Sequence, residues 1–382
     1  MIYDVAIVGA GPAGSYLAAL LARDGHAVAL LDKEEFPREK VCGGGISNKT
    51  IELLDDDIAP VVERRIRGAY LTYGNRDTVV RDLEGHSGVT VTRRGFDEFL
   101  LRRATSLGAR FFPSTRFLDV ASRNGLSELS TSRGTFRTRR LVGADGVFSQ
   151  VRARVFGPSL VRYAPALEAL VYVEPPVIER FADRILLDFG SMPKGYGWIF
   201  PKRDHLNVGV FSIYGSRCLK AELHAFMQHY DSLRSYREIR YKGSAIPVHN
   251  TRNLVERGPV MLLGDAAGFA ESFYGEGIYF ALRSAILAHR AMTGSGAEPG
   301  AYAALVRSEL ASELRYSRLN AQLFFPHQKF GFYRMVRSVH VNEYFAELIG
   351  GNVGHRECFY RTILTSPYWL WSRKYPPLST MF

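Results

Sequence analysis

The sequence predicts an α/β protein in which a nucleotide-binding domain with a parallel sheet carries an inserted antiparallel sheet and is followed by helices. Three patterns support this fold class. A GxGxxG motif stands between an apolar strand and an amphipathic helix near the amino terminus, period-two alternation runs between Tyr163 and Ile246, and helical periodicity begins at Tyr302. The 382 residues suffice for two or three packed units, and an apolar fraction of 46% excludes a disordered chain.

The amino terminus has the element order of a Rossmann-like nucleotide site. A strand, a glycine turn, a helix and a second strand follow one another: Val5–Val8, Gly9–Gly14, Ser15–Arg23 and Ala27–Leu31. Gly9 permits the tight turn, Gly11 lets a diphosphate approach the backbone, and Gly14 lets the helix pack on the strand. The phosphate charge would then lie at the N-terminus of the helix.

Asp32 ends the second predicted strand, where a carboxylate accepts hydrogen bonds from ribose hydroxyls. The same carboxylate repels a 2′-phosphate, which argues against NADP at this motif. NAD and FAD both remain compatible with it.

Two further glycine–aspartate segments follow short apolar strands. Gly143–Gly146 reads GADG, and Gly264–Gly268 reads GDAAG, while Gly275-Glu276-Gly277 opens a predicted helix over Tyr279–Arg290. In this order behind a GxGxxG motif, the segments resemble the two-dinucleotide-fold FAD enzymes of the p-hydroxybenzoate hydroxylase type. The resemblance implies that Asp265 contacts the ribityl and diphosphate part of FAD.

Two other segments resemble the geranylgeranyl reductase family. Phe36–Ser47 contains Cys42-Gly43-Gly44-Gly45 and is similar to the family's CGGG loop, and Tyr196–Lys202 followed by Gly209 is similar to its YxWxFPK…G signature. The matching motifs span roughly the first three-quarters of the chain. One departure is Ser272, which stands where family members often have proline.

The resemblance implies FAD as cofactor. No second complete GxGxxG motif occurs in the sequence, so the expected electron donor is NAD(P)H visiting the open flavin face or a ferredoxin. It implies an FAD site made of Gly9, Gly11, Ala13, Gly14, Asp32, Lys33, Cys42, Gly43, Gly44, Arg93, Asp145, Gly146, Gly264, Asp265, Gly275, Gly277 and Ile278. The helix that follows Gly277 would direct its N–H groups and the positive end of its dipole at the reduced, anionic flavin.

The chemistry of an isolated prenyl double bond points to further residues. Such a bond is electron-rich, so its reduction needs an acid and a wall that tolerates positive charge, which aromatic faces provide at about 0.5–2 kcal/mol per contact. Tyr196, Trp198 and Phe200 alternate along a strand and would share one face. Cys42, Tyr196 and Trp198 are the candidate catalytic residues, and Tyr196, Trp198, Phe200 and Tyr274 the candidate substrate-binding residues. The alternatives are three core aromatics, and a cysteine that is a small buried hydrophobe.

The motifs predict a domain organisation in three parts. The FAD domain comprises residues 1–67, 93–158 and 256–296, the substrate-binding sheet domain comprises 68–92 and 159–255, and the helical region comprises 297–382. A helix is predicted over Glu98–Leu107. The resemblance implies that Arg93 lies near the flavin, whereas on its own it would be a strand-end arginine.

Charge and cysteine usage limit the partners. The chain carries +11, of which Arg315–Phe382 contributes nine basic against three acidic residues among many aromatics. This segment suits an anionic lipid surface or a prenyl diphosphate, and alternatively forms a helical cap with solvated cations. A ferredoxin, being acidic, would be attracted; no nucleic-acid-binding pattern occurs. Three cysteines without a CxxC pair and ten histidines without HExxH spacing predict no metal site.

The sequence therefore predicts an FAD-dependent reductase that saturates C=C bonds of a geranylgeranyl-type chain by hydride transfer from flavin N5 and protonation. An FAD-dependent monooxygenase or halogenase of the same fold is the first alternative, and a non-catalytic flavoprotein is the second. No basic segment precedes the first strand and no apolar run reaches about 18 residues, so we expect a cytoplasmic protein or one bound peripherally at the inner face of the membrane.

Overall fold

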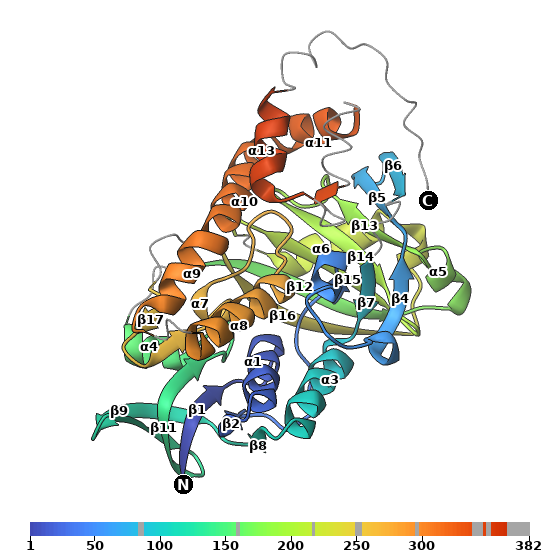
Figure 1. The fold of residues 1–382 in the computed structure, drawn as a ribbon. Coiled ribbons are helices and arrows are strands. Elements are labelled where there is room, and N and C mark those ends of the chain that lie inside the picture. Colours follow the sequence, from blue (N-terminus) through green and yellow to red (C-terminus); the bar gives the residue numbers. More distant parts are fainter. Residues whose placement is uncertain are drawn as a thin grey trace. The chain divides into compact units, whose positions relative to one another are not determined.

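The structure is a computed structural model that describes residues 1–82, 88–157, 161–215, 218–248, 254–294, 298–337, 347–348 and 353–364 (Figure 1). The chain divides into two compact units. The first comprises Met1–Lys40, Arg93–Arg162 and Ile246–Arg315, and the second comprises Val41–Thr92, Tyr163–Ala245 and Tyr316–Phe382. The three functional domains predicted above remain a prediction.

The first unit is built on a mostly parallel sheet with the strand order β17-β18-β11-β1-β2-β8. The strands are β1 (Ile2–Val8), β2 (Val28–Leu31), β8 (Arg110–Phe112), β11 (Gly134–Gly143), β17 (Glu256–Arg257) and β18 (Val260–Leu262). β1 pairs in parallel with β2 and β11, as a nucleotide-binding fold requires. An antiparallel hairpin of β9 (Phe117–Arg123) and β10 (Leu126–Thr131) extends β11.

The helices of the first unit confirm most of the expected elements. They are α1 (Pro12–Arg23), α3 (Arg93–Ser106), α4 (Gln150–Phe156), α7 (Gly264–Ala267), α8 (Ile278–Thr293) and α9 (Ala301–Glu309). α1 packs against both α3 and α8, and because it is composed of small and apolar side chains, its residues Pro12 to Ala22 are all buried (Figure 1). The expectation that Arg93 ends a strand is wrong: β7 stops at Val91, and Arg93 is the first residue of α3.

The second unit contains a seven-stranded sheet with the order β16-β12-β15-β14-β13-β5-β6. Its strands are β5 (Gly68–Tyr73), β6 (Asp77–Asp82), β12 (Arg162–Tyr172), β13 (Arg184–Asp188), β14 (Gly195–Pro201), β15 (Leu206–Ser212) and β16 (Glu238–Val248). β14 pairs antiparallel with β13 and β15, which confirms the antiparallel sheet expected from period-two alternation. A small sheet joins β3 (Gly45–Ile46), β7 (Gly88–Val91) and β4 (Val62–Ile66).

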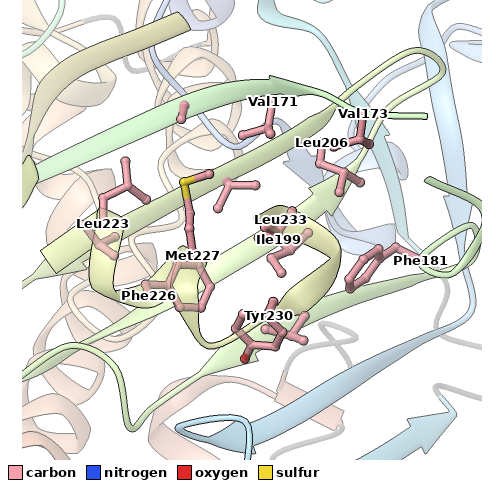
Figure 2. Close-up of a cluster of buried hydrophobic side chains, with 14 of the residues drawn as sticks. Val171, Val173, Phe181, Ile199, Leu206, Leu223, Phe226, Met227, Tyr230 and Leu233 are labelled. Atoms are coloured by element: carbon pink, nitrogen blue, oxygen red, sulfur yellow. The ribbon is translucent and has the colours of Figure 1, made fainter. Parts of the chain in front are cut away.

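One helix covers the core of this larger sheet. α6 (Leu219–Gln228) places Leu223, Phe226 and Met227 against sheet residues that include Ile199 and Leu206 (Figure 2). Burying an aliphatic or aromatic side chain of this size stabilises the fold by about 1.5–3 kcal/mol. The remaining short helices are α2 (Asn48–Ile51), α5 (Pro175–Glu179), η1 (Ala59–Val61) and η2 (Asp231–Leu233).

The carboxy-terminal region is helical where it is described, as predicted. Its helices are α10 (Ala311–Phe324), η3 (Phe325–His327), α11 (Gln328–Arg337) and α13 (His355–Leu364). Phe332 is buried, whereas Phe330 is exposed. The aromatic and basic residues expected at Tyr344, Phe345, Tyr368, Trp369, Trp371, Arg373 and Lys374 lie outside the described residues. Within the described ranges, no helix has the length and apolar character needed to cross a membrane.

Candidate active site

The turn between β1 and α1 contains two close backbone contacts that glycine alone permits. Gly9 has a φ of +105°, and a Cβ there would lie 2.3 Å from the carbonyl oxygen of Ala144. A Cβ on Gly14 would lie 1.8 Å from the carbonyl oxygen of Gly9. The packing of the protein itself therefore requires both glycines.

Gly11 differs, because its surroundings leave room for a side chain. A Cβ there would meet only the guanidinium of Arg38, at an ordinary contact distance of 3.6 Å. Gly11 is the N-cap of α1, its φ is −74°, and it supplies no side-chain cap; Ala13 in the same turn is buried. A bare backbone at the N-terminus of this 12-residue helix fits the approach of a diphosphate.

Asp32 is buried at the end of β2 and is held by two backbone groups. Its carboxylate accepts hydrogen bonds from the N–H of Ala10 at 2.7 Å and from that of Glu34 at 3.0 Å. A carboxylate has lone pairs for further donors, so it can also accept ribose hydroxyls. The neighbouring Lys33 points outward, with a side chain 58% exposed, and lies 4.0 Å from Glu34.

Asp265 stands in α7, directly after Gly264. Among the described residues its carboxylate has no hydrogen-bond partner, and a Cβ on Gly277 would lie 3.4 Å from its Oδ1. Burial raises the pKa of Asp265, while the positive charge of Lys40 opposes that rise most strongly. A half-buried acid without a donor fits a hydroxyl-bearing ligand, such as the ribityl chain that the sequence predicts here.

Three cations of the first unit gather around two acids. Arg93 donates to the fully buried Asp97 through Nε and Nη2, both at 2.7 Å, and Arg38 lies 3.0 Å from the same carboxylate. No hydrogen bond or ion pair ties down the amino group of Lys40 in the part of the chain that the structure describes, and burial lowers its pKa. Together with Asp265 these groups sum to one net positive charge, which favours a bound diphosphate.

Asp145, which the sequence predicts to bind FAD, also caps a helix. Its carboxylate accepts from Ser149 Oγ at 2.5 Å, from Gln150 N–H at 2.7 Å and from Val151 N–H at 3.2 Å, so it caps the N-terminus of α4. Burial raises its pKa, and these hydrogen bonds oppose the rise. Gly146 follows at a φ of +80°, and a Cβ there would lie 3.8 Å from Lys40 Nζ.

The loop before α8 is ordered by Glu271, which the sequence did not single out. This buried carboxylate accepts the N–H groups of Phe273 (2.7 Å), Tyr274 and Glu276 (3.1 Å). Gly275 follows with a φ of +74°, and Gly277 is the N-cap of α8, which begins at Ile278. The Tyr274 ring packs edge-on against the Phe273 ring at 4.8 Å.

In the second unit, the loop Cys42–Gly45, here called the cysteine loop, is fixed from two sides. Cys42 is half-buried, its N–H donates to Glu168 at 3.0 Å, and its sulfur accepts from the N–H of Gly44 at 3.4 Å. The Lys202 amino group donates to the carbonyls of Gly43 (2.8 Å), Gly44 (3.4 Å) and Val91 (2.8 Å).

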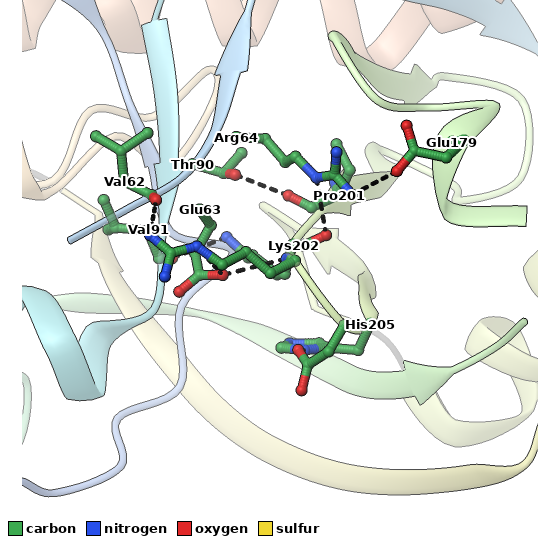
Figure 3. Close-up of polar contacts among 11 residues, drawn as sticks. Val62, Glu63, Arg64, Thr90, Val91, Glu179, Pro201, Lys202 and His205 are labelled. Carbon is green, nitrogen blue, oxygen red and sulfur yellow. Dashed lines mark hydrogen bonds and ion pairs between the residues drawn. The ribbon is translucent and has the colours of Figure 1, made fainter. Parts of the chain in front are cut away.

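Lys202 directly follows β14, and side-chain hydrogen bonds hold the backbone at this point. Thr90 donates to the carbonyl of Pro201 at 2.7 Å, and Arg64 donates to the carbonyl of Lys202 at 3.2 Å and to Glu179 at 2.7 Å (Figure 3). Burial lowers the pKa of Lys202 to about 8, although electrostatic interactions with Cys42, Glu63 and Glu168 oppose the change.

β14 carries Tyr196, Trp198 and Phe200, here called the aromatic row, next to this loop. The Tyr196 and Trp198 rings are buried with centroids 6.1 Å apart, and a Cβ on Gly43 would lie 3.1 Å from the Phe200 ring and 3.3 Å from Trp198 Nε1. Gly197, between them in sequence, instead faces Phe226 of α6. The expected alternation of faces is therefore confirmed, and the cysteine loop packs on the aromatic row.

The structure thus gathers the predicted residues into two groups. Gly9–Gly14, Asp32, Arg93, Gly264, Asp265 and Gly275–Ile278 belong to the first unit, and Cys42–Gly44 with the aromatic row belongs to the second. The residues present fit FAD, because Gly11 leaves space, α1 lacks a side-chain cap, and Asp265 and Lys40 lack hydrogen-bond partners among the described residues. Sequence reasoning missed Lys40, Glu168, Lys202 and Glu271; for Lys40 and Lys202 the available signal was a lysine inside a family-like motif.

Comparisons with known proteins identify relatives of this chain. A family model described as an FAD-binding domain matches residues 2–159. The chain is 31% identical over 294 residues to geranylgeranyl diphosphate reductase of Rhodobacter capsulatus, covering 74% of this chain and 72% of that protein. It is 31% identical over 320 residues to menaquinone reductase of Mycolicibacterium smegmatis, covering 77% of each.

A solved structure shows the same fold at greater sequence distance. It is a geranylgeranyl bacteriochlorophyll reductase-like protein from Thermoplasma acidophilum, with a TM-score of 0.76 and 20% identity, and the match covers 97% of this chain and 98% of that one. The mixed α/β architecture with an antiparallel sheet and carboxy-terminal helices is that of the p-hydroxybenzoate hydroxylase-type flavoenzymes. The chain belongs to the geranylgeranyl reductase family of FAD-dependent oxidoreductases.

Proposed function

We propose that this enzyme saturates C=C bonds of an isoprenoid chain. The supporting observation is the contact between the cysteine loop and the aromatic row: Gly43, the neighbour of the half-buried Cys42 in sequence, packs against Trp198 and Phe200. A proton source next to aromatic faces is what an electron-rich alkene needs. The names of the relatives, geranylgeranyl diphosphate reductase and menaquinone reductase, support a prenyl substrate.

FAD would be held in the first unit by the backbone of Gly9–Gly14, by Asp32 at the ribose, and by Asp265 and Lys40 beside its polar chain. When bound and reduced, it supplies a hydride. The direct readout of this assignment is loss of FAD affinity in variants of these residues.

The residues of the second unit would handle the proton and the charge. We assign proton donation to the Cys42 thiol: its S–H bond breaks as a C–H bond forms at the less substituted alkene carbon, and the tertiary carbon becomes electron-deficient. The faces of Trp198 and Phe200 would stabilise that positive charge by about 0.5–2 kcal/mol each. One proton and one hydride together give a gain of two hydrogens per bond.

The proposal includes two partners, an electron donor and an anionic lipid surface. The net charge of +11 favours an acidic electron donor such as a ferredoxin, and NAD(P)H is the alternative donor. The carboxy-terminal helices combine exposed Leu323 and Phe330 with the basic residues Arg315, Arg318, Lys329, Arg334 and Arg337, which supports contact with an anionic lipid surface.

The test is to photoreduce the FAD-loaded protein without oxygen and to add prenyl lipids. Geranylgeranyl diphosphate, a geranylgeranyl ether lipid and a menaquinone are compared by mass spectrometry. The proposal predicts products heavier by two hydrogens or multiples of two. Products that gain oxygen or halogen, formed only when oxygen is admitted, would instead identify a monooxygenase or halogenase.

A further inference from the structure

Two buried charged side chains of the second unit have no role in the reaction proposed above. Glu168 on β12 and Lys202 at the end of β14 are each 2% exposed. Burying a charge is costly unless hydrogen bonds compensate for the lost water. The hydrogen bonds that compensate here converge on the cysteine loop.

Glu168 connects that loop to the indole of Trp198. Its Oε2 accepts from the N–H of Cys42 at 3.0 Å and from Asn207 Nδ2 at 3.1 Å, and Asn207 Oδ1 accepts from Trp198 Nε1 at 2.7 Å. Gly209 leaves the space for this arrangement, since a Cβ there would lie 2.1 Å from the indole. One carboxylate oxygen therefore fixes the start of the loop and, through Asn207, the orientation of the indole ring.

Lys202 holds the other side of the loop. Its three N–H donors match three carbonyl acceptors, those of Gly43, Gly44 and Val91. Gly44 has a φ of +67°, and a Cβ there would lie 2.1 Å from the Val91 carbonyl oxygen, so the loop is pressed closely onto β7. The N–H of Gly44, fixed by these contacts, is the group that donates to the Cys42 sulfur.

We propose that Glu168 and Lys202 are positioning residues that hold the cysteine loop, and with it the Cys42 thiol, against the aromatic row. The inference rests on the proposed function, because it assigns the purpose of the positioning to proton delivery by Cys42. The geometry makes a specific claim about Glu168: both donors reach the same oxygen, so an amide carbonyl can accept both bonds, and hydrogen bonding rather than charge is what the loop needs.

Three variants separate these contributions. Glu168→Gln keeps an acceptor at the position of Oε2, Glu168→Ala removes it, and Lys202→Met keeps the length of the side chain without its donors. Asp188→Ala is the matched control. Asp188 is a buried carboxylate of the same unit that accepts backbone N–H groups from Gly74 and Gly190 at 2.8 and 2.7 Å and has no contact with the cysteine loop.

The measurement is amide hydrogen exchange of residues 41–46 in the full FAD-loaded chain, without prenyl substrate. Glu168→Ala and Lys202→Met should speed exchange at Cys42 and Gly44 roughly tenfold or more, about 1.4 kcal/mol, whereas Glu168→Gln should stay within about threefold of wild type. Asp188→Ala should speed exchange at its own donors, Gly74, Gly190 and Ser191, and leave residues 41–46 unchanged.

Equal acceleration by Glu168→Gln and Glu168→Ala, or acceleration of the loop by Asp188→Ala, would overturn the inference. If Glu168→Ala does not fold, Glu168→Gln and Lys202→Met decide the matter. Exchange needs no turnover, so absence of alkene reduction would defeat the proposed function without touching this result, and unchanged exchange would defeat only the positioning role.

Discussion

Replacement of Gly11 by alanine separates FAD binding from folding. A Cβ there meets only the Arg38 guanidinium, at 3.6 Å, and the φ of −74° suits alanine. Alanine lowers the conformational entropy of the unfolded chain, which stabilises the folded protein by about 0.4–1 kcal/mol. Alanine is also a poor N-cap, which destabilises it by about 0.5–2 kcal/mol. These effects oppose each other, so the free energy of unfolding of the FAD-free protein should fall by no more than about 1.6 kcal/mol.

The same methyl group would occupy the approach to the backbone that a diphosphate needs. Overpacking of a close contact costs about 1–3 kcal/mol, which corresponds to roughly 5- to 150-fold weaker FAD binding. FAD titration followed by flavin fluorescence, with urea unfolding of the FAD-free protein, measures both quantities. Gly14→Ala is the contrasting variant, because its Cβ would lie 1.8 Å from the Gly9 carbonyl oxygen and should destabilise the fold itself by at least about 3 kcal/mol. Wild-type FAD affinity in a stable Gly11→Ala protein would refute the reasoning.

Three further outcomes are expected. Cys42→Ser should slow alkene saturation by about 10²–10⁴-fold in stopped-flow experiments while reduction of the bound flavin is unchanged; a wild-type rate would move proton donation to another group. Lys40→Met should weaken FAD binding about tenfold at low salt, and Lys33→Met, at an exposed side chain, should weaken it less; the reverse order would contradict the site described here. Burial lowers the pKa of Lys202 from 10.5 to about 8, so between these pH values the unfolded chain binds a proton there that the folded chain lacks. The free energy of unfolding of wild type relative to Lys202→Met, measured by urea unfolding, should therefore rise by up to about 3 kcal/mol from pH 8 to 10.5. A difference that does not change with pH would refute this expectation.

Sequence reasoning was strongest where chemistry and local structure share one segment. The glycine turn between β1 and α1 is an example, because the same spacing that admits a diphosphate also demands φ of +105° at Gly9 and a close contact at Gly14. The face shared by Tyr196 and Trp198 is another, because strand alternation alone determines it.

The residues that sequence reasoning missed depend on contacts between distant segments. Glu168 and Cys42 are 126 positions apart, and Lys202 and Gly43 are 159 positions apart. Nothing in local spacing shows that a glutamate on one strand accepts the N–H of a loop so much earlier in the chain. The start of α3 was misplaced although the contact there is local: Arg93 forms an ion pair with Asp97, one helical turn further on.

In the proposed reaction, electrons placed on the bound cofactor end in a prenyl C=C bond. The most direct measurement is electron stoichiometry: a known number of electrons is loaded into the FAD-loaded protein without oxygen, geranylgeranyl diphosphate is added, and the products are counted by mass spectrometry. We expect one bond to be saturated, with a gain of two hydrogens, for every two electrons that leave the flavin. A flavin that stays reduced in the presence of prenyl lipid and is reoxidised only by oxygen would contradict it.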